Sequence, residues 1–289
     1  MRDLNYQLKQ LCQRNRDGSF ATQADRERLL NLVGNQLVEL GYRHMNADSL
    51  KPKHVAALVA QWQQDNIGTG TIKNRMSALR WWAEKIGKAN VVARANSAYG
   101  IEERVLVGKG SKAKTLDAEL LAKVTDPYTA LSLRLEAAFG LRREESIKLM
   151  PNWADCGDVL RLKDSWTKGG KYREVPIRSA EQRAVLDDAK ALANGGSLIP
   201  AHMMYRDQLN RFKAQCAKAG IHGVHGLRHH YAQRRYAELT GWQSPAAGGP
   251  TSRQLTTEQK LRDRAARLEL SLEMGHYREQ ITAVYLERQ

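Results

Sequence analysis

The chain has 289 residues, of which 42% are hydrophobic and 27% charged, and its formal net charge is +15. This composition is that of a globular protein with one large or two modest cores, and it excludes a largely disordered chain. No apolar run is long enough to span a membrane, and the N-terminus lacks the apolar core of a signal peptide. We therefore expect a cytoplasmic protein.

The positive charge is spread along the chain. Residues 1–100 hold 15 Lys and Arg against 8 Asp and Glu, and residues 101–289 hold 31 against 23. Positive charge at this density suits a polyanionic partner, of which nucleic acid is the commonest. Because both halves are basic, the charge fits a protein that grips a duplex from two sides. The three cysteines form no CxxC pair, so we expect reduced thiols.

Three apolar stripes at helical spacing predict an all-helical first segment, residues 1–105. The stripes are Leu30, Val33, Leu37 and Leu40; Val55, Leu58, Val59 and Trp62; and Ile72, Met76, Leu79, Trp82 and Ile86. Gly41 supplies a C-terminal stop for the first of these helices. On the third helix Lys73, Ser77 and Arg80 are predicted to face outward, either as an ordinary solvated face or toward a partner.

A linker and a second segment of mixed structure follow. The linker is placed at residues 106–115, within a stretch rich in Lys, Gly and Ser. Residues 116–289 combine helices with a β-hairpin, whose strands are predicted at residues 159–163 and 173–177 around a polar loop. Residues 241–252 have the composition of a loop. Thr256 and Gln259 predict a capping box that opens a helix ending near residue 273.

Four short stretches of the second segment contain residues suited to chemistry. They are AFGLRREE at residues 138–145, TKGGK at 167–171, HGLR at 225–228, and GH at 275–276, followed nine positions after the histidine by Tyr285. Taken singly, each has an ordinary structural explanation: an ion pair, a hairpin turn, a shared helix face or a packed tyrosine.

Together the stretches supply a set of six residues: Arg142, Lys168, His225, Arg228, His276 and Tyr285. Two arginine forks can hold a phosphate bidentately, and imidazoles can add hydrogen-bond donors. A lysine on a loop can protonate a leaving oxygen, and a phenol oxygen can form a covalent phosphate ester. The set suits attack on a phosphodiester, and it needs no metal or cofactor.

The order and spacing of this set resemble the tyrosine recombinases, or phage-type integrases, over roughly residues 20–289. Gly140-Leu-Arg142 with Glu145 resembles the family's GLRxxE box, and TKGGKYREVPI resembles its hairpin segment GKGxKxRxVPL. HGLRHHY resembles HDLRHTF, and MGH resembles LGH, with the family's usual gap to the tyrosine. In the first segment, the stretch from Thr71 to Trp81 resembles the TI…SALR helix of the core-binding domain.

The resemblance implies a nucleophile and its phosphate clamp. Tyr285 would attack the DNA, giving a 3′-phosphotyrosine and a free 5′-hydroxyl, and the 5′-hydroxyl of a partner strand would reverse the step. Arg142 and Arg228 would clamp the scissile phosphate, with His276 supporting it. Glu145 would order the first arginine rather than touch DNA.

The resemblance also implies proton transfers at both ends of the step. Lys168 would be the general acid that protonates the leaving 5′ oxygen. His225 would shuttle the proton of the nucleophile or hydrogen-bond the phosphate.

The fold implied by the resemblance is mainly α with a small antiparallel β-sheet, in two domains that form a C-shaped clamp around duplex DNA. Residues 1–105 would be the helical, SAM-like core-binding domain and residues 116–289 the catalytic domain. The protein would be a site-specific DNA recombinase or integrase of a phage or other mobile element. Its partners would be double-stranded recombination sites and three further copies of itself, with which it would form a tetramer on DNA. An accessory DNA-bending protein is a candidate partner. The protein would be cytoplasmic and associated with the nucleoid.

Three features depart from the family pattern. Gly226 stands where HDLR has its aspartate, and 47 residues separate Arg228 from His276, about twice the usual number. The extra residues are roughly 240–261. Four residues follow Tyr285, whereas many relatives pass a longer segment to a neighbouring subunit. One hypothesis is that the insertion and its charged helix dock on a neighbour instead; the other is that the helix is an ordinary solvated face.

Several alternatives stay open at this point. The stretch GKGSK at residues 108–112 also fits GKGxK, but no strand follows it, so we assign it to the linker. Tyr277 is assigned a structural role. Four histidines at positions 222, 225, 229 and 230 lie near Cys216, but the loose spacing gives little support for zinc. A DNA-binding relative that no longer cuts and a type IB topoisomerase-like relaxing enzyme remain alternative functions.

Overall fold

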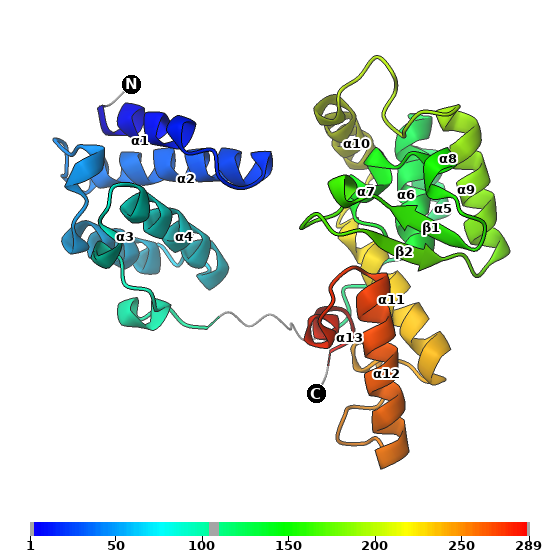
Figure 1. Cartoon of the computed structure of the whole chain (residues 1–289). Helices are drawn as coiled ribbons and strands as arrows, with labels where there is room; N and C mark the ends of the chain where they lie inside the picture. The colour runs from blue at the N-terminus through cyan, green and yellow to red at the C-terminus, as the bar shows by residue number, and fades with distance from the viewer. Residues whose placement is uncertain (1–2, 104–109, 288–289) are drawn as a thin grey trace. The chain divides into compact units, whose positions relative to one another are not determined.

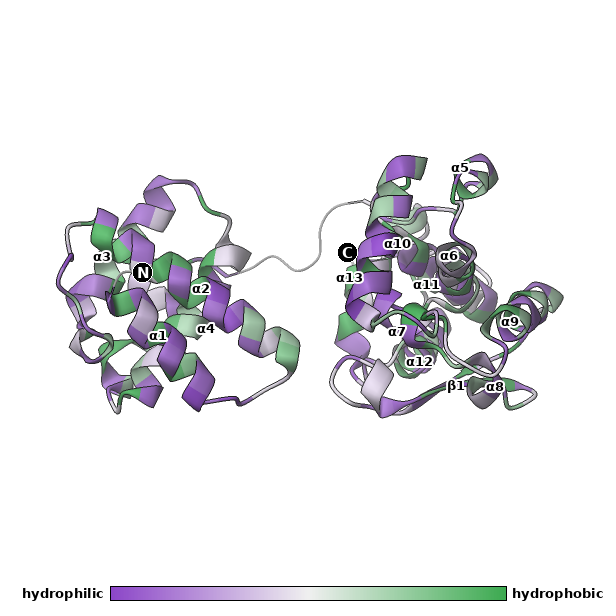
Figure 2. Cartoon of the chain, turned by 90° about the horizontal axis from the view of Figure 1, so that it is seen from above, coloured by the Kyte–Doolittle hydropathy of each residue, from purple (hydrophilic) through white to green (hydrophobic). Residues whose placement is uncertain are grey.

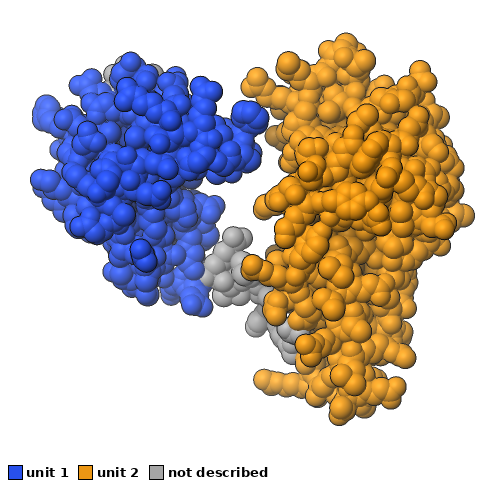
Figure 3. All heavy atoms as spheres, in the orientation of Figure 1, with its two compact units in different colours: residues 1–105 blue, residues 106–289 orange. Residues whose placement is uncertain are grey.

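The computed structural model describes residues 3–103 and 110–287. It divides into two compact units, Met1–Val105 and Leu106–Gln289, each with its own core (Figures 1 and 3). Unit 1 is helical, and unit 2 is helical with one two-stranded antiparallel sheet. The expected fold class, mainly α with a small antiparallel sheet, is therefore confirmed. None of the described helices is both long and apolar enough to cross a membrane.

Unit 1 has four α-helices among its described residues. They are α1 (Asp3–Arg14), α2 (Phe20–Glu39), α3 (Pro52–Gln64) and α4 (Thr69–Lys85), with 3-10 turns at Ala47–Ser49, Ala89–Val91 and Asn96–Tyr99. Each helix carries hydrophobic and hydrophilic residues together (Figure 2), and the apolar ones form a single core around Trp62 and Trp82, both 0% exposed.

The predicted helices of unit 1 are confirmed, with one correction. Helix α2 starts where Ser19 accepts a hydrogen bond from the amide of Thr22, and it ends before Gly41, whose φ of +93° lies in the left-handed region. Arg80, predicted to face outward, is half-buried and donates to the carbonyl of Ala93 and the side chain of Asn96. These two hydrogen bonds connect α4 with residues 93–96, which follow it in the chain. The long guanidinium side chain can reach both acceptors at once.

Unit 2 is built around α6, which packs against α7, α9 and α11. Its α-helices are α5 (Ala118–Ala122), α6 (Pro127–Phe139), α7 (Arg143–Lys148), α8 (Pro151–Ala154), α9 (Ala180–Ala193), α10 (Tyr205–Ala219), α11 (His225–Thr240), α12 (Thr257–Glu273) and α13 (Ala283–Leu286). The strands are β1 (Val159–Leu162) and β2 (Arg173–Pro176), and 3-10 turns lie at Asp164–Trp166, Pro245–Ala247 and Glu279–Thr282.

The predicted hairpin is confirmed. Strands β1 and β2 pair antiparallel with Leu160 opposite Val175 and Leu162 opposite Arg173. All four side chains are buried, and they alternate with more exposed residues along each strand. Arg173 is therefore a charged residue on the buried face of the hairpin, where it requires a partner.

The insertion, roughly residues 240–261, consists of a loop and the start of α12, a helix that packs along α11 (Figure 1). The predicted capping box is present: Thr256 accepts from the amide of Gln259, whose side chain accepts from the amide of Thr256. The solvated-face hypothesis is wrong for two residues, because Asp263 and Arg267 are buried in an ion pair beside Tyr236. Apolar side chains are exposed instead, at Leu261, Leu268 and Leu272.

Candidate active site

Tyr285 lies at the centre of a polar cluster although only 4% of it is exposed. Its hydroxyl is 3.0 Å from Nε2 of His276, and Nε of Arg228 donates to it over 3.3 Å. Arg228 also approaches Nε2 of His276 with a terminal nitrogen. Because a guanidinium has only donors, we assign Nε2 as the acceptor nitrogen, and in that tautomer the phenol donates its proton toward the imidazole. The hydroxyl is oriented to lose that proton to His276.

Arg228 is fixed by backbone carbonyls. It is 1% exposed, and its terminal nitrogens donate to the carbonyls of Gly140 and Met274. Gly140 ends α6 with a φ of +61°, and a Cβ there would lie 2.4 Å from the ring of Tyr231, so only glycine fits. Burial lowers the pKa of Arg228 to about 10, which leaves it cationic at neutral pH.

Arg142 is held by Glu145 at the start of α7. The carboxylate accepts from the backbone amide and from Nη1 of Arg142, both over 2.7 Å, and Nη2 donates to the carbonyl of Met274. Both arginines thus bond to the carbonyl of Met274, two residues before His276. The two guanidinium groups therefore meet at the turn that carries the histidine, a geometry suited to one anionic group.

Arg173 is a site residue that the sequence argument left without a role. It is 4% exposed and donates two hydrogen bonds to Glu145, over 2.7 and 2.8 Å. Burial alone would raise the pKa of Glu145, but the hydrogen bonds and charge of Arg173, with the charges of Arg228 and Arg142, lower it to about 2. The place of Arg173 in the predicted second strand was a signal, since it alternates with Glu174 and shares the apolar face with Val175.

Gly275 is explained by the same arginine. Its φ is +69°, and a Cβ would lie 2.9 Å from Nη1 of Arg173. The glycine of the MGH stretch therefore lets the His276 turn close over the Arg173–Glu145 pair.

Three imidazoles surround the phenol ring. The ring centroid of Tyr285 is 4.7 Å from that of His229, 5.6 Å from His276 and 6.2 Å from His225. Burial and the charges of the nearby arginines lower the pKa of His276 to about 3. Burial, with His225 and Lys112 close by, lowers that of His229 to about 4. Loss of water and the same arginines lower the pKa of His225 as well. All three are neutral near pH 7.

Lys168 is the one predicted site residue that the structure does not bring to this cluster. It lies exposed in the loop between β1 and β2, and within residues 110–287 its ammonium has no hydrogen bond or ion pair. The neighbouring Lys171 lies 4.4 Å above the ring of Tyr277, whose hydroxyl donates to the carbonyl of Tyr172. Tyr277, the residue that follows His276, thus connects the His276 turn with the hairpin loop.

The helix that precedes His276 is anchored by a second ion-pair cluster. Glu273, 5% exposed, accepts two hydrogen bonds from Arg178 and one from the hydroxyl of Tyr231. Arg235 pairs with Glu269 one turn earlier on α12. These contacts fix the end of α12 to α11 and to the segment after β2, and so fix the start of the His276 turn.

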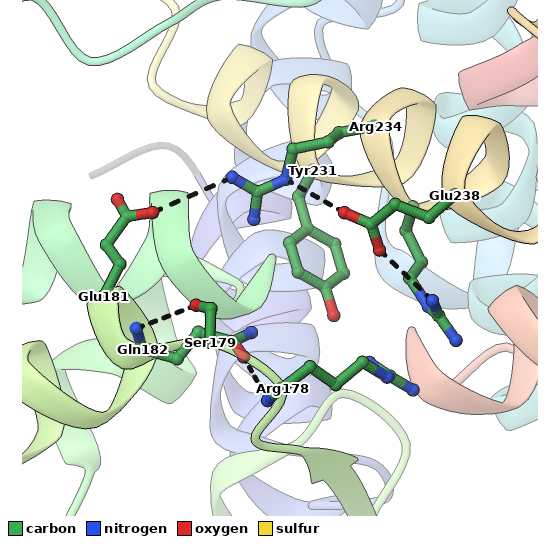
Figure 4. A pocket seen from close by; sticks show the side chains of 8 residues that line it. Arg178, Ser179, Glu181, Gln182, Tyr231, Arg234 and Glu238 are labelled. Atoms are coloured by element: carbon green, nitrogen blue, oxygen red, sulfur yellow. Dashed lines mark hydrogen bonds and ion pairs between the residues drawn. The ribbon is translucent and has the colours of Figure 1, made fainter.

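A surface cavity of about 260 Å³ adjoins this cluster (Figure 4). It is lined by Arg178, Ser179, Glu181, Gln182, Tyr231, Arg234, Arg235 and Glu238. Arg234 bridges Glu181 and Glu238, and the other two arginines are paired with carboxylates as described. With its positive charges already matched, the cavity is a poor site for an anion.

Two family profiles match the sequence. "Phage integrase, N-terminal" matches residues 1–92, and "Integrase" matches residues 102–234, which together span more than three quarters of the chain. The second match contains Arg142, Lys168, His225 and Arg228 and stops before α12 and the His276–Tyr285 stretch. No curated protein matches the chain in sequence.

Solved structures share the fold. A lambda integrase (75–356) dimer bound to a COC′ core site is 13% identical, with a TM-score of 0.60 over 99% of this chain and 96% of that one. XerH recombinase in a post-cleavage complex with palindromic difH is 16% identical, with a TM-score of 0.59 over 99% and 81%. The Tn1549 transposon integrase in complex with circular intermediate DNA is 15% identical, with a TM-score of 0.57 over 98% and 96%. A lambda integrase tetramer bound to a Holliday junction is also similar, at 13% identity and a TM-score of 0.56 over 95% and 77%.

Proposed function

The chain belongs to the phage integrase family of tyrosine recombinases, and from this we propose that it cleaves and rejoins DNA strands with Tyr285 as the nucleophile. The observation that carries the proposal is the hydroxyl of Tyr285, which donates toward a neutral imidazole while a fixed guanidinium donates to its oxygen. A phenol held in this way can transfer its proton as its oxygen attacks phosphorus.

The strand-breaking step conserves its bonds and protons. The phenol oxygen of Tyr285 forms a bond to phosphorus as the bond from phosphorus to the 5′ oxygen breaks. His276 accepts the phenol proton once the bound phosphate, an anion beside its imidazole, raises the pKa of that group, and Lys168 gives a proton to the leaving 5′ oxygen. The phosphotyrosine keeps the energy of the phosphodiester, so a 5′-hydroxyl can reverse the step without another energy source.

Arg142 and Arg228 would stabilise the charge that gathers on the nonbridging oxygens. Their guanidinium groups are oriented before DNA binds, by Glu145 and by backbone carbonyls. Donors that are already oriented cost no reorganisation during the reaction, which is where electrostatic catalysis gains most. The imidazole that meets the phenol hydroxyl is that of His276. The ring of His225 lies near the ring of Tyr285 without bonding to its hydroxyl, and we assign His225 to the phosphate.

We assign DNA recognition to both units. Residues 1–105 would be the core-binding domain and residues 116–289 the catalytic domain, joined by residues 106–115, in a C-shaped clamp on the duplex. The division of the chain into two compact, separately basic units supports this. Basic groups on both would neutralise phosphates on opposite sides of the helix and make binding strongly salt-dependent.

The active assembly is proposed to be four copies on two DNA sites, as in the lambda integrase tetramer, and to serve a phage or other mobile element. An accessory DNA-bending protein is a further candidate partner. The exposed leucines of α12 offer an apolar contact to a neighbouring copy, while the loop before α12 packs in cis against α13. Loss of recombination without loss of cleavage in Leu268→Glu would support the contact between copies.

The test of function is strand exchange. A binding site is selected from a random-sequence duplex pool, and two DNAs that carry it are incubated with the protein. The expected product joins one arm from each DNA. Binding without cleavage would point to a relative that no longer cuts, and relaxation of supercoiled plasmid without exchange would point to a topoisomerase-like enzyme.

A further inference from the structure

The nucleophile lies on a helix too short to hold its own position. Helix α13 comprises only Ala283–Leu286, and a single turn of helix is not stable by itself. The carbonyl groups at the end of a helix have no partner within the helix and must find one elsewhere. The placement of Tyr285 therefore depends on what contacts its backbone as well as its hydroxyl.

Gln233 of α11 supplies a contact to that backbone. Its Nε2 donates to the carbonyl of Tyr285 over 3.0 Å, and the side chain is 6% exposed. It lies on the buried stripe of α11, one turn after His229. A buried amide must bond at both its donor and its acceptor, so its orientation is set by a second partner.

The second partner is Ser111, 122 residues earlier in the chain. The Ser111 hydroxyl lies 3.0 Å from both Oε1 and Nε2 of Gln233, so it can donate to one and accept from the other. The amide is thereby held between Ser111 and the backbone of Tyr285. Ser111 belongs to the segment through which the chain enters unit 2.

That segment is itself attached to the start of α11. The amide of Lys114 donates to the carbonyl of Gly226, and its ammonium donates to the carbonyl of His222. A Cβ at Gly226 would lie 2.7 Å from Cγ of Lys114 and 2.8 Å from the carbonyl oxygen of Lys112. The family's aspartate could not fit under the segment, which gives a physical reason for glycine at this position.

We propose that Gln233 is a positioning residue for the nucleophile, and that Ser111 orients Gln233, so that the interdomain segment takes part in placing Tyr285. This inference rests on the proposed function of Tyr285. One serine and one glutamine thereby connect the start of the described part of unit 2 with the backbone of the nucleophile.

The experiment compares four variants of the full-length protein in single-turnover cleavage of a selected duplex, nicked so that the covalent complex accumulates. Gln233→Ala and Gln233→Glu should both lower the cleavage rate about tenfold, the effect of one lost hydrogen bond to a fixed carbonyl. The glutamate is informative because it can still accept from Ser111 but cannot donate to Tyr285. Ser111→Ala should lower the rate about threefold, since it loosens Gln233 without removing it.

The two effects should not multiply. In the double variant Gln233→Ala with Ser111→Ala, the rate should equal that of Gln233→Ala alone, because Ser111 acts through Gln233. DNA affinity should stay at the wild-type value in every variant. Gln215→Ala is the matched control, because Gln215 also bonds to the backbone of a distant residue, where its Oε1 accepts from the amide of Thr125, but away from the site.

Wild-type cleavage by Gln233→Glu would overturn the inference, as would a multiplicative loss in the double variant. A parallel loss of DNA affinity, or a rate loss that Gln215→Ala shares, would also overturn it by showing a general structural effect. None of these results would touch the proposed function, whose failure would appear as covalent complex formed by Tyr285→Phe.

Discussion

The arginines beside Tyr285 and the lysine of the hairpin are assigned to one reaction, yet the fold holds them in opposite ways. Arg228 is 1% exposed and bonds to two carbonyls, and Arg142 is locked to Glu145. Lys168 lies exposed in its loop, and within the described part of unit 2 its ammonium meets no acceptor. The cluster at Tyr285 is assembled before DNA binds, whereas the hairpin loop is not part of it.

The difference matches what each group has to do. Charge on the nonbridging oxygens is best stabilised by donors that are already fixed. Holding the arginines in hydrogen bonds before DNA binds therefore favours catalysis. A proton donor must meet an oxygen that arrives with the DNA, and catalytic hydrogen bonds of this kind often form only in the complex. We therefore expect substitutions at the loop to be repaired by substrate chemistry, and substitutions at the arginines not to be.

The largest effect is expected at Lys168. Lys168→Ala should slow cleavage of ordinary DNA on the order of 10³-fold, within the range of general acid catalysis. A substrate with a 5′-bridging phosphorothiolate has a leaving group that needs little protonation, so most of the rate should return. Lys171→Ala is the control in the same loop. Equal impairment of Lys168→Ala on both substrates would assign the acid to another residue.

Arg142→Lys should lower cleavage by on the order of 10²-fold or more on either substrate. The ammonium keeps the charge, but it cannot reproduce the fork that meets Glu145 and the phosphate together. The adjacent exposed Arg143→Lys should be nearly silent. Near-normal cleavage by Arg142→Lys would reduce this arginine to a structural role.

A smaller loss is expected at Arg173. Arg173→Lys removes the paired hydrogen bonds to Glu145 and should slow cleavage about tenfold, because Arg142 loses its fixed partner. DNA affinity should not change, and the loss should shrink in the Arg142→Lys background. Arg161→Lys on the neighbouring strand is the matched control. Additive losses in the double variant would mean that the two arginines act independently.

The last prediction concerns stability rather than the rate of cleavage. Burial raises the pKa of Glu136 to about 8, against an ordinary value of 4.5. A raised pKa contributes stability that is complete below the unfolded value and is lost as the pH rises through the folded one. Glu136→Gln should therefore raise the free energy of unfolding at pH 8 by on the order of 2 kcal/mol and change it little at pH 4.5. A gain of the same size at both pH values would refute the pKa shift.

Features that depend on local sequence were predicted correctly, whereas contacts between distant residues were not. The helix stops, the hairpin and the Thr256 capping box follow from local chemistry, and the structure has them where they were predicted. Arg173 was visible as a charge on the apolar face of a strand, but its partner is 28 residues away and depends on how α7 meets the hairpin. Gln233 and Ser111 left no local signal, because their contact spans 122 residues.

Gly226 is a departure that the sequence shows but does not explain. The missing aspartate was plain in the sequence, but its cause lies in the segment at residues 112–114, which packs where the side chain would be. The buried Asp263–Arg267 pair likewise follows from the packing of α12 on α11 beside Tyr236, which periodicity alone does not reveal. Tertiary packing decides which charged residues of an amphipathic helix are buried.

The central claim is that Tyr285 is the nucleophile, and mapping the covalent adduct tests it most directly. Wild-type protein is incubated with a nicked selected duplex, the complex is digested, and the modified peptide is identified by mass spectrometry. The account predicts a 3′-phosphotyrosine at Tyr285, and a Tyr285→Phe protein that binds the duplex with normal affinity and forms no adduct. An adduct on another residue, or one that persists in Tyr285→Phe, would contradict it.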